Sequence, residues 1–394
     1  MNIRIEEIRL RNWKSYKDSK LYIEPLTFII GYNASGKSNV LDALHFLSEL
    51  SKGTAIDEVG SDIRGGKDWI ISREEESCGI DVKIHNDDTD FFYTIEFTKK
   101  EEKLVITQER LSENSKDLLL TDESKVLPNE MLLSMTSYTA KQGRRRPLQV
   151  LRDKSALFQL ASAGLRKEVT DGINIVLNSL KNIFVLNPIA PLMRNYTSLQ
   201  KELKEDASNI AGVIAAIEES DKNKLQERIA EFVRPLPERD IVRVWTETVG
   251  MFGKDAMLYC EENWIDGKTQ KLDARGMSDG TLRFIAIVTA LLTLPEKTLL
   301  LIEEVDNGLH PSRSKELIKA LEELGRERNI DVLCTTHNPY LIDSLGTDMI
   351  PCITYVKRNE HTGSSELKTL DENENLVNMM ASGSIGLSMV KGRI

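Results

Sequence analysis

Residues 26–39, LTFIIGYNASGKSN, join an apolar run to a loop that fits the pattern G-x-x-x-x-G-K-[ST]. The run predicts a buried strand, and apolar residues at i, i+1, i+4 and i+7 from Val40 predict a helix over residues 37–51. A glycine-rich loop between a strand and a helix wraps phosphates, because its amides point inward at the positive end of the helix dipole. The sequence therefore predicts a phosphate-binding loop.

The residue types in this loop match the chemistry of a nucleotide site. Gly31 and Gly36 allow the backbone to approach the phosphates closely. Lys37 is placed to reach the β and γ phosphates, and the Ser38 hydroxyl can ligate Mg²⁺. The residues expected to bind the nucleotide here are Gly31, Asn33, Ser35, Gly36, Lys37, Ser38 and Asn39.

Composition narrows the class of protein. The 394 residues are 40% hydrophobic and 29% charged, as in ordinary soluble proteins. With a net charge of −10, any contact with nucleic acid must come from a local basic patch. The four cysteines are widely spaced in the sequence, so we interpret them as free thiols of a protein in a reducing compartment. No signal peptide and no apolar run of about 20 residues is present, so we expect a cytoplasmic protein without a membrane span.

The chain alternates between strand-like and helical regions. Residues 1–30 predict two strands leading into the strand before the loop, and the alternating segments 78–86, 91–98 and 103–110 predict a meander. The polar residues 112–130 read as a flexible loop.

A helical pattern follows from about 153 to 235. It has polar breaks near 187–195 and 219–223 and ends at Pro235 and Pro237. Two strands around 240–248 and 255–262 and a turn at Asp266-Gly267 come next.

A second set of polar residues follows two apolar strands near the C-terminus. The run KTLLLIEE (297–304) predicts a core strand that delivers Glu303 and Glu304 to the edge of the sheet where ligands bind. Beside a magnesium nucleotide, Glu303 would hold the metal through water and Glu304 would position the attacking water. The strand DVLCTTH (331–337) ends in His337, which can sense a γ-phosphate or be an ordinary structural histidine.

The segment GMSDGT (276–281) opens an apolar helix. Ser278 is a good N-cap, and the amides near Gly280 make a second anion-binding helix start. The alternative is a capped core helix with no ligand.

Together GYNASGKSN, GMSDGTLR, LLLIEEVDNGLHP and TTHNPYLID stand in the order found in ABC-class P-loop ATPases. The chain resembles the SMC, RecF and OLD type, and most closely the compact AAA-family members of bacterial genome maintenance and phage defence. The resemblance implies an α/β fold: an ABC-type P-loop NTPase head with an antiparallel β lobe and a helical insert. The expected domains are the ATPase core at 1–55 and 270–394, the β lobe at 56–150, and the insert with a returning hairpin at 151–269.

The resemblance also implies a head-to-tail homodimer with ATP and Mg²⁺ between the subunits. Ser278 and Gly280 would then contact the γ-phosphate of the partner's nucleotide, Glu304 would be the catalytic base and His337 the switch histidine. Asp306 and Asn307 would lie in the loop that crosses the interface. Two positions depart from the usual pattern: Glu303 replaces the usual Asp, and Asp279 occupies a small-residue position of the signature motif.

Two further assignments rest on the resemblance. Asn12-Trp13-Lys14-Ser15-Tyr16 is similar to the N-F-[KR]-S-[FY] element, whose basic residue approaches the nucleotide, so Lys14 is either such a contact or a solvated strand end. The glutamine of the magnesium site has two candidates, Gln142 and Gln149.

Three functions fit this class. The first is an ATPase subunit of antiviral defence or DNA processing that controls a separate effector, a nuclease or a toxin. Only 57 residues follow His337, too few for the nuclease domain of OLD-like proteins, so we expect the effector in another chain. The alternatives are a RecF-like clamp loader and a non-enzymatic scaffold held together by ATP. The basic residues Lys141, Arg144, Arg145 and Arg146 either contact DNA or RNA or form a solvated loop.

Overall fold

The computed structural model describes residues 3–122, 124–125, 127, 129–138, 146–235, 241–263, 268–374, 376, 379 and 384–390. The chain forms two compact units. Unit 1 comprises residues 1–24, 29–184 and 354–372, and unit 2 comprises residues 25–28, 185–353 and 373–394. Strand β3 (Leu26–Ile30) contributes residues to both. The predicted turn at Asp266-Gly267 lies outside the described residues, as do Lys141, Gln142, Arg144 and Arg145.

Unit 1 is built on an antiparallel sheet of eight strands in the order β2-β1-β4-β5-β6-β7-β8-β9. Their bounds are β1 (Ile3–Trp13), β2 (Tyr16–Tyr22), β4 (Ser77–Asn86), β5 (Thr89–Lys100), β6 (Lys103–Glu113), β7 (Lys116–Thr121), β8 (Leu132–Ser137) and β9 (Arg146–Leu151). The predicted meander is confirmed by β4, β5 and β6. The prediction of a flexible loop over residues 112–130 was wrong at β7, whose Leu118 and Leu119 are fully buried although polar residues flank them.

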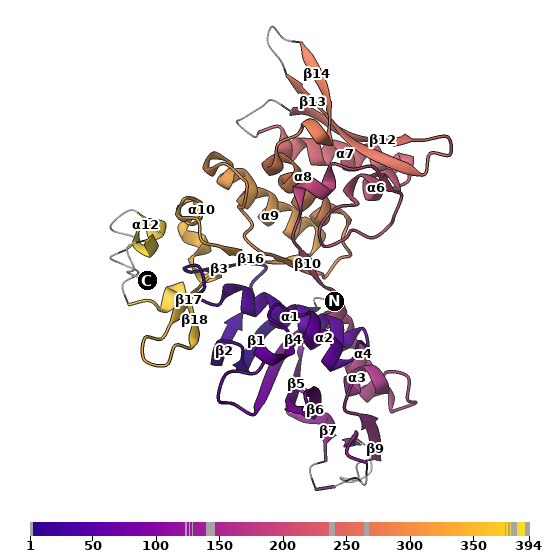
Figure 1. Cartoon of the computed structure of the whole chain (residues 1–394), viewed down its shortest axis with the longest axis vertical. Helices are drawn as coiled ribbons and strands as arrows, with labels where there is room; N and C mark the ends of the chain where they lie inside the picture. The colour runs from indigo at the N-terminus through magenta and orange to yellow at the C-terminus, as the bar shows by residue number, and fades with distance from the viewer. Residues whose placement is uncertain are drawn as a thin grey trace. The chain divides into compact units, whose positions relative to one another are not determined.

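The helices of unit 1 are α1 (Lys37–Ser51), α2 (Ile56–Asp62), α3 (Ala156–Leu160) and α4 (Lys167–Lys181), and they lie beside the sheet (Figure 1). Trp13 of β1, Phe46 of α1 and Phe97 of β5 form an aromatic core, with Trp13 5.2 Å from Phe46 and 6.5 Å from Phe97 between ring centroids. Within this unit, the end of β3 neighbours β17 (Ile353–Arg358), which pairs with β18 (Ser365–Thr369).

Unit 2 contains the parallel pair β15 (Leu299–Ile302) and β16 (Asp331–Thr336), in the order β10-β15-β16-β3. β10 spans Ile183–Leu186. All four side chains of β15 are buried, as expected for a strand covered on both faces. The helices near this pair in sequence are α8 (Asp279–Thr293), α9 (Ser314–Arg328), α10 (Pro339–Ser344) and α12 (Ile385–Val390).

A second sheet of unit 2 is antiparallel, and α6 (Ile210–Ala215) and α7 (Glu219–Val233) cover one of its faces (Figure 1). Its strands are β11 (Thr197–Ser198), β12 (Ile241–Val249), β13 (Asp255–Asn263) and β14 (Thr269–Asp273). The two strands predicted around 240–248 and 255–262 are confirmed. The predicted break at 219–223 was wrong: α7 begins at Glu219, where acidic side chains favour a helix N-terminus. The break near 187–195 holds the short helix α5 (Ala190–Met193).

Two expectations from the composition concern membrane spans and cysteines. None of the described helices combines the length and the apolar character that a membrane span needs. Within the part of the chain that the structure describes, the four cysteines form no disulfide, and three of them are buried. Burial raises the pKa of the Cys78 and Cys334 thiols.

Candidate functional site

The loop at residues 31–36 has a backbone that favours glycine at two positions, Gly31 with φ +153 and Gly36. Gly36 caps α1 with φ +118, in the left-handed region. A Cβ at Gly36 would lie 2.5 Å from Ser365 Oγ and 2.9 Å from Ser15 Oγ. The second motif glycine is therefore required by both its dihedral angle and its neighbours.

Two distant serines brace this loop. Ser365 of β18 donates from its amide to Ser15 O over 2.7 Å, and its hydroxyl donates to Ser35 O over 2.5 Å. Asn39 Nδ2 donates to Ser15 Oγ over 2.8 Å, and the Tyr16 hydroxyl donates to Gly36 O over 3.0 Å. The role of Ser365 escaped the sequence analysis, because 330 residues separate it from Ser35 and no local pattern links them.

Polar groups of the loop suit bound phosphate. Lys37 is 7% exposed, and its Nζ donates to the carbonyls of Gly31 and Tyr32, each over 2.8 Å. Ser35 Oγ is buried and has no hydrogen-bond partner among the described residues. Asn33 is exposed, and Ser38 is half-buried in the first turn of α1. A phosphate oxygen would give the Ser35 hydroxyl an acceptor.

Lys14 is held inside unit 1. Its Nζ lies 2.5 Å from Asp42 Oδ2 and donates to Arg64 O over 2.8 Å. Burial lowers the pKa of Lys14, and the Asp42 carboxylate opposes that shift. The preceding Trp13 is a core residue whose Nε1 donates to Asn39 O over 2.7 Å, so this element ties β1 to the start of α1.

The acidic residues of unit 2 lie in the turn that follows β15. The strand ends at Ile302, so Glu303 and Glu304 come after it. Glu304 N donates to Thr335 Oγ1 over 2.9 Å, and Val305 N donates to Thr335 O over 3.0 Å. The Thr336 hydroxyl donates to Asp306 Oδ1 over 2.6 Å. The buried end of β16 therefore fixes the acidic turn.

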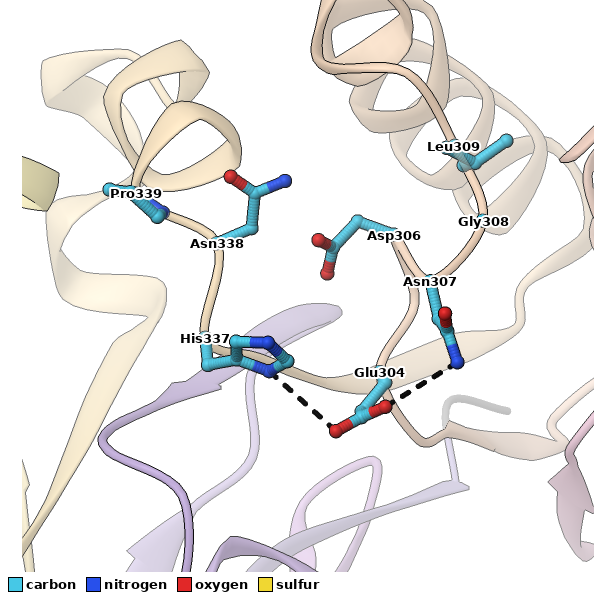
Figure 2. Close-up of a pocket in the computed structure, with 8 residues that line it drawn as sticks. All are labelled: Glu304, Asp306, Asn307, Gly308, Leu309, His337, Asn338 and Pro339. Carbon is cyan, nitrogen blue, oxygen red and sulfur yellow. Dashed lines mark hydrogen bonds and ion pairs between the residues drawn. The ribbon is translucent and has the colours of Figure 1, made fainter.

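The Glu304 carboxylate lies between His337 and Asn307 (Figure 2). Its Oε1 is 3.6 Å from His337 Nδ1, and its Oε2 accepts from Asn307 Nδ2 over 3.5 Å. These residues and Asp306 line a pocket of about 350 Å³. Glu304 also has φ +46, a conformation that costs about 1 kcal/mol or more for a residue with a Cβ and is concentrated at functional sites.

The start of α8 has the predicted cap. Ser278 Oγ accepts from Thr281 N over 3.1 Å, and Ser278 itself is exposed. Gly280 permits a close backbone approach, because a Cβ there would lie 2.3 Å from Gly308 O. Asp279 pairs with Arg194, whose Nη2 lies 2.6 Å from the carboxylate and also donates to Met277 O.

Arg194 neutralises Asp279 at the start of α8. This ion pair explains how an acidic residue is accommodated at a position of the signature segment that usually has a small residue. The sequence offered no signal for this pair, because the partners are 85 residues apart. The remaining predicted residue, Gln149, lies on β9 of unit 1 and is exposed.

Replacing Gly36 with alanine is expected to weaken ATP binding at least about tenfold and to lower the free energy of unfolding by about 1–3 kcal/mol, because the left-handed backbone is strained for alanine. Gly346→Ala is the matched control, since Gly346 has φ −66 and no atom within 4 Å of a built Cβ. Calorimetric ATP titration and thermal melting measure both effects. Wild-type affinity in Gly36→Ala would contradict this account of the loop.

A loop with the phosphate-binding motif precedes α1 in unit 1, and in unit 2 carboxylates follow β15 and a histidine follows β16, in the chain order expected for an ABC-class P-loop ATPase head. Residues 3–130 match a protein-family model described as "AAA ATPase domain", and residues 181–343 match one described as "AAA domain, putative AbiEii toxin, Type IV TA system". These two matches support an ABC-class ATPase.

Individual relatives agree with this class. The chain is 22% identical over 361 residues to an ATP/GTP phosphatase of Helicobacter pylori, covering 86% of this chain and 87% of that protein. A 47-residue stretch is 43% identical to the DNA replication and repair protein RecF of Lactococcus lactis, covering 12% of this chain and 13% of RecF. A 43-residue stretch is 49% identical to the DNA double-strand break repair Rad50 ATPase of Thermoplasma volcanium, covering 11% and 5%.

The fold has a counterpart among solved structures. An SMC head bound to the C-terminal winged-helix domain of ScpA superposes with a TM-score of 0.52 at 16% identity, covering 93% of this chain and 97% of that one. The α/β class predicted from the sequence is thereby confirmed.

Proposed function

We propose that this chain binds and hydrolyses ATP, with the phosphates in the loop Gly31–Ser38. The observation that carries the proposal is the arrangement of Glu304, which is fixed by Thr335 and lies 3.6 Å from His337. In this proposal Glu304 would position or deprotonate a water, and His337 would contact the γ-phosphate. Asn33, Ser35, Lys37 and Asn39 complete the loop contacts, while Lys14 acts by holding α1.

The oxygen donors of the site suit Mg²⁺. Ser38 offers a hydroxyl in the first turn of α1, and Glu303 offers a carboxylate, both of which are hard ligands of the kind Mg²⁺ prefers. When bound there, the ion would neutralise charge on the β and γ phosphates.

We also propose that two copies close head to tail on ATP. Ser278 and Gly280 would approach the partner's γ-phosphate, with Asp306 in the adjoining loop. The exposed Ser278 at this helix start supports the arrangement, because a helix N-terminus favours an anion. Opening on hydrolysis would control a separate nuclease or toxin in antiviral defence or DNA processing, within the cytoplasm.

A measurement of ATP turnover distinguishes the proposed ATPase from a scaffold that binds ATP without hydrolysing it. Phosphate release by the wild-type protein with ATP and Mg²⁺ should exceed that of Glu304→Gln by at least about 100-fold. ATP binding without turnover above that background would favour the ATP-held scaffold. GTP belongs in the same assay, because the relative from Helicobacter pylori is named an ATP/GTP phosphatase.

A RecF-like role on DNA is the second candidate, because the local relatives RecF and Rad50 are both named for DNA repair. If the basic cluster contacts DNA, Arg144/Arg145/Arg146→Ala should weaken DNA binding and reduce the slope of log affinity against log salt by up to about 2.7, at about 0.9 per phosphate contact. Titrations with labelled DNA across a salt series measure both quantities. An unchanged affinity and slope would remove the cluster from a role in DNA binding.

A further inference from the structure

The helix α12 packs against α10 within unit 2 (Figure 1). α10 begins at Pro339, two residues after His337, and Pro339 lines the same pocket as His337 and Glu304 (Figure 2). The segment around α12 belongs to none of the sequence motifs. Its contacts with α10 nevertheless reach the residues that surround the proposed switch histidine.

The side chain of Asp343 on α10 joins the two helices. Its Oδ2 accepts from the Ser384 hydroxyl over 2.7 Å, and its Oδ1 accepts from Gly386 N over 2.7 Å. Ser384 Oγ also accepts from Leu387 N over 2.8 Å, so the serine that donates to Asp343 caps the first turn of α12. Both oxygens of one carboxylate on α10 therefore hold the start of α12.

Gly386 brings the backbone of α12 into direct contact with Pro339. Gly386 is buried, and a Cβ at this position would lie 2.2 Å from Pro339 O and 2.7 Å from Pro339 Cα. Both of these neighbours are main-chain atoms, which cannot rotate away as the end of a side chain can. Any side chain at position 386 therefore has to displace either α12 or the first residue of α10.

The start of α10 affects the place of His337, because the residue between them has little freedom. A proline restricts the residue before it to extended dihedral angles, and Asn338 has φ −85 and ψ 113. Asn338 N donates to Thr336 Oγ1 over 3.0 Å, and Asn338 Oδ1 accepts from Tyr340 N over 3.0 Å. Since Thr336 ends the buried strand β16, a shift of Pro339 has to be taken up by His337 and Asn338.

We propose that Gly386 and Asp343 are positioning residues of the ATPase. By holding α12 against the start of α10, they keep His337 opposite Glu304, at 3.6 Å. The inference rests on the proposed function, in which His337 contacts the γ-phosphate. A displaced His337 slows hydrolysis, because a misplacement of about 1 Å can cost about 100-fold in rate. ATP binding persists, since the loop at residues 31–38 belongs to unit 1.

The test measures single-turnover ATP hydrolysis and the Kd for ATP with Mg²⁺, at a temperature well below the melting temperature of each variant. Gly386→Ala should lower the hydrolysis rate at least about tenfold and leave the Kd within about twofold of wild type. Gly346→Ala is the matched control and should keep the wild-type rate. Gly346 directly follows the C-cap of α10, and a Cβ there would have no atom within 4 Å.

Asp343 provides a second pair of variants, which decides the question if Gly386→Ala does not fold. Asp343→Ala removes two hydrogen bonds to α12 and should lower the rate at least about threefold. Asp343→Asn keeps one carbonyl oxygen for Gly386 N, and its amide can donate to Ser384 Oγ, so it should restore most of the rate. A wild-type rate in Asp343→Ala would contradict the role of Asp343.

A double-mutant cycle separates positioning from a general effect on the fold. Gly386→Ala should have almost no further effect in a His337→Ala protein, because its effect passes through that histidine. Rate losses that multiply in the double variant overturn the inference, as does a wild-type rate in Gly386→Ala when His337→Ala is slow. In both cases the proposed ATPase survives. A wild-type rate in His337→Ala, or wild-type protein without hydrolysis, contradicts the proposed function and this inference together.

Discussion

Lys37→Ala should raise the Kd for ATP at least about 100-fold, which corresponds to about 2.8 kcal/mol. In the structure the Lys37 ammonium is buried within the loop and donates to the carbonyls of Gly31 and Tyr32. Bound phosphates would replace these acceptors with charged ones, and charge-assisted hydrogen bonds contribute about 1.5–3 kcal/mol each. The shift in melting temperature that ATP causes, together with a calorimetric titration, measures the loss.

Lys52→Ala is the matched control for this experiment. Lys52 follows α1 at its other end, is 45% exposed and pairs with Glu49 at the surface, so its removal should leave the affinity for ATP unchanged. The melting temperature of each variant without nucleotide reports whether the fold is intact. Near wild-type affinity in a folded Lys37→Ala protein would place the phosphates elsewhere than the loop at residues 31–38.

Local patterns predicted the parts of the site that are close in sequence. The strand before the loop, the start of α1 after Gly36 and the Ser278 cap are encoded within a few residues by apolar spacing, a glycine and a capping hydroxyl. The acids after β15 were also placed correctly near a strand end, although the strand itself is shorter than the run 297–304 suggested.

The parts that the sequence could not predict are side-chain contacts across long separations. The hydrogen bond from Ser365 to the phosphate loop and the ion pair between Arg194 and Asp279 leave no periodic or compositional signal in the sequence. A single such contact does not change the local sequence pattern around either partner. Strand β7 was missed for a different reason: its leucines are buried in the sheet, and tertiary packing overrides the polar character of the flanking residues.

Glu304→Gln should reduce ATP hydrolysis at least about 100-fold while ATP binding is retained, since a general base contributes about 10²–10⁴-fold to a rate. Glutamine keeps the size of the side chain and can still contact Asn307 and His337, but it accepts no proton. The hydrogen bond from Glu304 N to Thr335 Oγ1 involves the main chain and is unaffected by the substitution, so the turn should keep its conformation. Phosphate release in single-turnover assays measures the rate, and a nucleotide titration measures the binding.

The same variant tests the dimer, because ATP that is bound but not hydrolysed should hold two copies together. Light scattering with ATP and Mg²⁺ should then give twice the monomer mass for Glu304→Gln, and a monomer mass without nucleotide. Glu296→Gln is the control, since Glu296 precedes the same strand at its opposite end and is 64% exposed. A Glu304→Gln protein that binds ATP yet stays monomeric would contradict the proposed dimer with ATP between its two subunits. Hydrolysis by this variant near the wild-type rate would show that Glu304 is not the catalytic base.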